Sequence, residues 1–125
     1  DPAKNSGLPS VAERARDQGM KVGIITSVSL NHATPAAFYA HVPSRNDYYG
    51  IALQMLDSGF DFFAGGGIHK ARGNKKDTPQ KDAYDIAAEK GYRVLRSRDD
   101  ILALKPDAWK VIAVNPVLDR DNAMP

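Results

Sequence analysis

The sequence contains no cysteine, and it has only three histidines and one tryptophan among its 125 residues. The absence of cysteine excludes disulfides and thiolate metal sites. Net charge is also small, because 17 basic and 15 acidic residues leave a formal charge of +2. Charges of both signs are mixed along the chain, and this pattern does not indicate a nucleic-acid-binding protein.

Long apolar segments are missing as well. We therefore expect neither a signal peptide nor a membrane span in this chain. Hydrophobic residues make up 42% of the sequence, enough for one small core, and the length is typical of one domain. Because no repeat, low-complexity segment or linker divides the chain, we predict a single α/β segment over residues 1–125.

The spacing of apolar residues predicts an alternation of helices and strands. Helices are expected at 8–18, 35–41, 47–58, 78–90 and 97–104, and strands at 21–26, 60–64, 92–95 and 109–114. Such an alternation with short links is typical of an α/β fold, here a mostly parallel sheet flanked by helices. The strand order stays open. Residues 1–7 are predicted to form a leading loop, and 118–125 a loosely held tail.

The chain is organised around a polar segment, residues 26–45, which follows the first predicted strand. Open α/β sheets usually place their sites just after the carboxyl ends of strands. Pro35 suits the first turn of a helix, so Thr34 is predicted to be its N-cap. The hydroxyl of Thr34, the imidazole of His32 and the guanidinium of Arg45 would together suit an oxyanion bound beside a cation.

Each of these residues also has an ordinary structural interpretation. Thr34 could be only a helix cap, His32 only a polar loop residue, and Arg45 a partner of a surface carboxylate. His41 ends the short predicted helix, and there we expect a structural role rather than a ligand.

Two further segments invite a functional interpretation. Gly65–Gly67 could cradle a phosphate, but its spacing matches neither a P-loop nor a dinucleotide fingerprint, so we favour a tight exit from a strand. The basic run at 69–76 could contact an anionic partner. A solvated loop is the commoner role of such a run, and we expect His69 to be exposed.

The segments His32–Ala37 and Ala40–Arg45 closely resemble the central motif of the alkaline phosphatases. The resemblance extends over the whole chain, as far as the last predicted strand. It implies that the chain forms a portion of the alkaline phosphatase fold. It also implies that Thr34 is a magnesium ligand, that His32 lies in or next to the magnesium shell, and that Arg45 is a catalytic residue that holds the substrate phosphate.

Enzymes of that family hydrolyse phosphate monoesters through a phosphoenzyme, with two zinc ions and one magnesium ion. Their nucleophile lies in an Asp-Ser-Ala type motif that precedes the histidine motif, and no such motif occurs here. Asp57-Ser58-Gly59 follows the motif and is better interpreted as a helix end. Three histidines cannot supply the zinc sites. We therefore expect an internal fragment that is inactive alone, with the zinc sites outside this chain.

The resemblance further implies a homodimer in the intact enzyme and a periplasmic or extracellular location. Two alternatives remain open. One is a non-catalytic anion-binding domain that uses Arg45 and the Gly65–Gly67 turn. The other is an assembly module, because a piece of a larger sheet leaves unpaired strand edges through which the isolated chain would self-associate.

Overall fold

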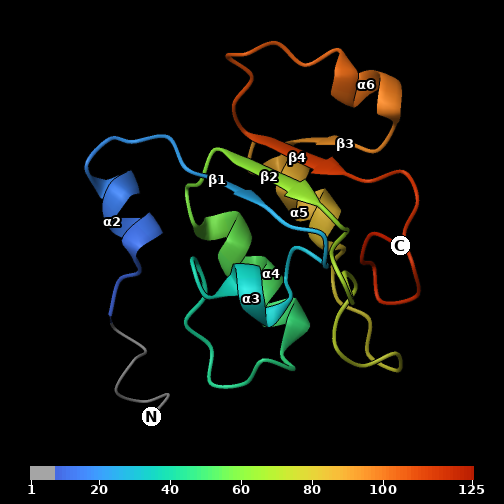
Figure 1. Cartoon of the computed structure of the whole chain (residues 1–125). Coiled ribbons are helices and arrows are strands. Elements are labelled where there is room, and N and C mark those ends of the chain that lie inside the picture. Colours follow the sequence, from blue (N-terminus) through green and yellow to red (C-terminus); the bar gives the residue numbers. More distant parts are fainter. Residues whose placement is uncertain (1–7) are drawn as a thin grey trace.

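The computed structural model describes residues 8–125 and contains one four-stranded parallel sheet (Figure 1). The strands follow the order β1-β2-β4-β3 across the sheet. Their bounds are Gly23–Ile25 (β1), Phe62–Gly65 (β2), Arg93–Leu95 (β3) and Val111–Val114 (β4). The predicted α/β fold with a parallel sheet is confirmed. The leading loop predicted at 1–7 lies outside the described residues.

Five helices are present in the described part of the chain. They are α2 (Val11–Asp17), α3 (Ala33–Ala36), α4 (Tyr48–Asp57), α5 (Ala83–Glu89) and α6 (Arg98–Leu102). Figure 1 shows α3, α4 and α5 on one side of the sheet and α6 on the other. This division follows from right-handed crossovers, because only the β3-to-β4 connection runs back across the sheet.

Side-chain caps set where several helices begin. Asp47 accepts a hydrogen bond from the backbone N–H of Gly50 at 3.0 Å, and Ser97 accepts one from that of Asp100 at 3.1 Å. Each bond satisfies a donor that the first helical turn leaves without a partner. Both caps begin helices that the sequence predicted; the sequence left the first cap open between Asn46 and Asp47, and the structure has Asp47.

Helix α5 begins later than predicted, at Ala83 rather than near Thr78. The intervening backbone is used elsewhere: the N–H of Gln80 donates to the carbonyl of Arg72 at 2.6 Å, and that of Ala83 to Ala71 at 2.8 Å. These contacts with a distant segment override the helix-start signal of Thr78-Pro79. Asp82 caps the helix instead.

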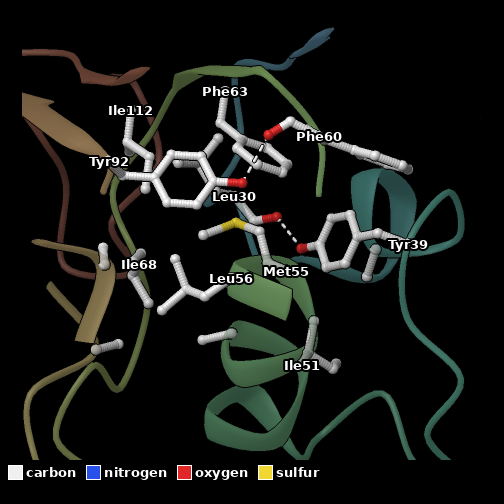
Figure 2. Close-up of a cluster of buried hydrophobic side chains, with 14 of the residues drawn as sticks. Leu30, Tyr39, Ile51, Met55, Leu56, Phe60, Phe63, Ile68, Tyr92 and Ile112 are labelled. Atoms are coloured by element: carbon white, nitrogen blue, oxygen red, sulfur yellow. Dashed lines mark hydrogen bonds between the residues drawn. The ribbon is translucent and has the colours of Figure 1, made fainter. Parts of the chain in front are cut away.

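The core lies between the sheet and α4 and is rich in aromatic rings (Figure 2). Phe63 of β2 lies at its centre, with ring centroids 5.9 Å from Tyr39 and 6.1 Å from both Phe60 and Tyr92. The two buried tyrosine hydroxyls donate to the backbone, Tyr39 to Leu30 at 2.5 Å and Tyr92 to Phe60 at 2.6 Å. Burial raises the pKa of Tyr92 to about 12, so its hydroxyl stays a neutral donor.

The tail after β4 is held in place, which corrects the prediction of a loose end. The backbone N–H of Met124 donates to the carbonyl of Ser27 at 2.7 Å, and that of Gly67 donates to Asn122 at 2.8 Å. The Asp119 carboxylate accepts from two N–H groups within the same turn. The tail therefore packs beside the loops that follow β1 and β2.

Both outer strands have an open edge in residues 8–125, since β1 pairs only with β2 and β3 only with β4. Ile25 on the β1 edge is 78% exposed. Self-association of the isolated chain stays a prediction. No helix among the described residues is long and apolar enough to cross a membrane.

Candidate functional site

Three loops meet at the carboxyl edge of the sheet. They follow β1, β2 and β4, and short backbone hydrogen bonds join them. The N–H of Leu30 donates to the carbonyl of Gly67 at 2.9 Å, and the N–H of Gly66 donates to Val28 at 3.2 Å. This edge is where parallel α/β sheets usually place their sites. The residues predicted to be functional begin at the end of the first loop.

The Gly65–Gly67 turn is a close-packed exit from β2. A Cβ atom on Gly65 would lie 1.7 Å from the Thr26 carbonyl oxygen, and one on Gly66 would lie 2.4 Å from that of Val28. The N–H groups of Gly66 and Gly67 already donate to carbonyls. The tight-exit interpretation is confirmed, and these two N–H groups are not available to cradle a phosphate.

His32 caps helix α3, a role that the sequence analysis assigned to Thr34. The imidazole Nδ1 of His32 accepts a hydrogen bond from the backbone N–H of Thr34 at 3.2 Å. Helix α3 thus begins at Ala33, and Thr34 is its second residue. Pro35 is the third residue of α3, and proline is tolerated throughout the first turn of a helix, so it did not fix the first position. The structure therefore brings His32 and Thr34 together.

Arg45 lies apart from Thr34 in this structure. Its side chain is exposed and lines a hollow of about 170 Å³ beside the alanines of α3. Thr34 is exposed too, but it lines another hollow, of about 480 Å³, together with Phe38 and residues of α2 and β1. Among the described residues, no carboxylate lies within ion-pair distance of Arg45. The surface ion pair considered for Arg45 is thus absent from this part of the chain.

A buried amide that the sequence analysis missed fixes the loop before His32. Asn31 is fully buried, and its Nδ2 donates to the carbonyls of Tyr48 and His69, both at 2.8 Å. Its Oδ1 accepts from the N–H of His69 at 2.8 Å. One side chain thus joins the loops after β1 and β2 to the start of α4. Only its place directly before the motif histidine hinted at this role.

His69 is half-buried rather than exposed, which corrects the prediction. Its Nδ1 lies 3.2 Å from Oδ1 of Asn122 in the tail, and its ring meets Tyr48 edge to face at 4.7 Å. Because an amide oxygen can only accept, Nδ1 of His69 carries the proton in this contact. The prediction failed because no local sequence signal indicates that the tail folds back onto this loop.

His41 has the structural role that we expected. Its Nε2 lies 2.7 Å from the Glu13 carboxylate, and its backbone N–H donates to Gln54 at 2.6 Å. Burial alone would raise the pKa of Glu13. Hydrogen bonds from Ser10 and His41, together with the charge of His41, outweigh burial and hold that pKa below its usual value. The pair connects α2 to the segment after α3.

Residues 8–125 contain no group of three or more histidines and carboxylates that could hold a metal ion. Thr34 offers an oxygen donor whose hydroxyl has no hydrogen bond within this part of the chain. His32 has one ring nitrogen, Nδ1, occupied by the cap, and its side chain is half-buried. Of these two groups, the Thr34 hydroxyl is the one that suits part of a magnesium site, because magnesium prefers oxygen ligands and keeps several waters.

The alkaline phosphatase family model matches residues 2–112. The chain belongs to the alkaline phosphatase family. Among relatives, alkaline phosphatase 4 of Bacillus subtilis is 31% identical, over 94% of this chain and 27% of its own length. The human tissue-nonspecific isozyme is 33% identical, over 82% of this chain and 21% of its own length. The family resemblance is thereby confirmed.

Solved structures agree with this assignment. The alkaline phosphatase from the Antarctic bacterium TAB5 is 31% identical with a TM-score of 0.72, over 92% of this chain and 32% of that one. A variant of the TAB5 enzyme, in which a histidine is replaced by aspartate, has magnesium bound in its M3 site. The chain thus spans between a fifth and a third of the length of these relatives, and its four-stranded sheet is one portion of their fold.

Proposed function

We propose that this chain is the part of a phosphate monoester hydrolase that contributes Arg45 to the substrate phosphate and Thr34 to a magnesium site. The observation that carries the proposal is the His32–Thr34 pair at the carboxyl edge of the sheet, in a chain that matches the alkaline phosphatase family. The nucleophile and the zinc ligands would come from other parts of the protein. A periplasmic or extracellular location and a homodimer remain further parts of this proposal.

Arg45 would bind two phosphate oxygens at once through its planar guanidinium. Its exposure and its lack of a carboxylate partner among the described residues support this role, because no competing anion has to be displaced. Because the substrate and the product both carry the phosphate charge, Arg45 would contribute to the binding of both.

His32 would act beside the magnesium ion rather than as its direct ligand. Since Nδ1 accepts the Thr34 N–H, the neutral ring carries its proton on Nε2. An N–H at Nε2 donates to a water or phosphate oxygen and cannot ligate a metal. Metal ions, when bound, would supply Lewis-acid stabilisation of the attacking and leaving oxygens.

The Thr34 hydroxyl is tested by Thr34→Val in the full-length protein, which replaces it with a methyl group of similar size. With an aryl phosphate as substrate, we expect the magnesium concentration for half-maximal activity to rise roughly tenfold or more. Thr78→Val, at another exposed threonine, is the matched control and should leave that concentration unchanged. Equal magnesium dependence in all three proteins would refute the role of Thr34, and no hydrolysis by the parent protein would refute the proposed activity.

A further inference from the structure

The loop between β2 and α5 encloses a strongly basic hollow that the proposed function does not use. We define the basic loop as residues 70–76. The hollow has a volume of about 590 Å³. Its lining contains no carboxylate and no aromatic ring, and consists of Lys70, Ala71, Arg72, Gly73, Asn74, Lys75, Lys76 and Pro79.

Positive charge is concentrated in this loop. The basic loop contains four cations and no acidic residue, while the whole chain has a net charge of +2, so the remainder sums to 2 − 4 = −2. In residues 8–125, none of these four side chains lies within ion-pair distance of a carboxylate. Four cations around one hollow repel each other, and a multivalent anion would relieve that repulsion.

The backbone of the basic loop is fixed on both sides. At its base, carbonyls of Ala71 and Arg72 accept hydrogen bonds from the segment that leads into α5. At its tip, the Asn74 amide accepts from the N–H of Tyr49 at 3.0 Å and donates to the Asp47 carboxylate at 2.6 Å. The backbone that carries the cations is thus in place before any ligand arrives, which lowers the entropic cost of binding.

Lys70 is constrained further. Its φ of 51° lies in the left-handed region, which is unfavourable for a lysine. Its Nζ lies 5.5 Å from the centroid of the Tyr48 ring, a distance at which a cation is attracted to the ring face. Backbone strain of this kind persists only where the surrounding structure enforces it. The rim of the hollow is therefore a defined feature of the fold.

We propose that the basic loop binds an anion that carries two or more linked phosphate groups, such as a condensed phosphate. Four cations around a hollow of this size can contact more oxygens than a single phosphate group provides. Because no ring lines the hollow to stack on a base, the phosphates themselves are what the loop recognises. The basic loop does not include His32, Thr34 or Arg45. This proposal can therefore be tested independently of the proposed phosphatase function.

The test is calorimetric titration of the full-length protein with methylenediphosphonate, whose P–C–P bridge resists hydrolysis. All proteins carry Arg45→Ala, so that the proposed substrate site contributes little to the signal. We expect methylenediphosphonate to bind at least tenfold more tightly than inorganic phosphate, and added salt to weaken it. The double substitution Lys75→Ala with Lys76→Ala should weaken binding roughly tenfold or more.

The matched control removes two cations elsewhere, through Arg93→Ala with Arg98→Ala. Both arginines are exposed, on β3 and α6, and we expect the affinity to stay within about twofold of the parent protein. If the two double variants lost the same affinity for methylenediphosphonate, the binding would reflect only general charge attraction. That result would overturn the proposal. Absence of binding at millimolar methylenediphosphonate, or equal affinity for inorganic phosphate, would overturn it as well.

Discussion

The side-chain amide of Asn31 holds both backbone polar groups of His69. Its Oδ1 accepts from the N–H at 2.8 Å, and its Nδ2 donates to the carbonyl at 2.8 Å. The second hydrogen of Nδ2 reaches the carbonyl of Tyr48. The amide thus donates two hydrogen bonds and accepts one, in a side chain fully removed from solvent. The loop that presents His32 is positioned by this amide.

Loss of this amide should destabilise the protein strongly. Asn31→Ala removes three hydrogen bonds and leaves buried backbone groups without partners, so we expect the free energy of unfolding to fall by about 2–4 kcal/mol. Urea unfolding measures it. Asn46→Ala is the matched control, because Asn46 is exposed, and it should change stability by less than about 0.5 kcal/mol. Equal effects of the two substitutions would mean that the Asn31 contacts add nothing.

The close approach of β1 and β2 gives a second prediction. Gly65 has a φ of 140°, and an added Cβ would overlap the Thr26 carbonyl. Gly65→Ala should therefore cost about 4 kcal/mol or more, or prevent folding. Gly19→Ala, at a φ of 86° with open space around it, should cost only about 1 kcal/mol. Thermal unfolding compares the two variants, and similar melting temperatures would contradict the close packing.

The order of elements could be read from the sequence because its signals are local. Gly59 and Gly91, with φ of 73° and 92°, follow helices as the pattern predicted. The caps formed by Asp47 and Ser97 are local too, because a cap depends only on residues within one helical turn. The parallel sheet followed from the alternation of helices and strands. The motif that carries the family assignment is also continuous in sequence.

The remaining features depend on contacts between distant segments, which one sequence does not reveal. The start of α5 and the tail that reaches Ser27 result from backbone hydrogen bonds across loops. The partial burial of His69 results from contacts with the side chains of Asn31, Tyr48 and Asn122. That Arg45 and Thr34 line different hollows depends on packing between distant segments. Asn31 could not be distinguished from an ordinary loop residue, because its partners are 17 and 38 positions away.

The contact between Glu13 and His41 predicts a pH dependence of stability. Because the pKa of Glu13 is lowered on folding, the folded carboxyl binds its proton more weakly than the unfolded one. Its contribution is fully present above the ordinary value of 4.5 and is lost as pH falls through the folded pKa. Glu13→Gln should lower stability at neutral pH and flatten the decline in acid.

Urea unfolding between about pH 3 and 7 measures this effect. Glu89→Gln is the control, because Glu89 forms an exposed ion pair with Lys81. That variant should keep the pH dependence of the parent protein, since exposed ion pairs contribute little. If Glu13→Gln also kept the pH dependence of the parent protein, the lowered pKa of Glu13 would not contribute to stability.

The central claim is that Arg45 binds the substrate phosphate. Arg45→Ala in the full-length protein should raise KM and weaken inhibition by inorganic phosphate, with a smaller loss in kcat. We expect a total loss in kcat/KM of about 2–4 kcal/mol, as for a charged partner removed from a site. Arg45→Lys should recover little of it, because an ammonium group cannot contact two oxygens in the same plane.

The inhibition constant for inorganic phosphate is the most direct measurement, because it reports the contact between Arg45 and phosphate without the chemical step. It should be determined for the parent protein, Arg45→Ala, and Arg98→Ala as a control at an exposed arginine outside both proposed anion sites. The proposal predicts an inhibition constant raised roughly tenfold or more in Arg45→Ala and unchanged in Arg98→Ala. An unchanged constant in Arg45→Ala would contradict the assignment of Arg45 to the phosphate.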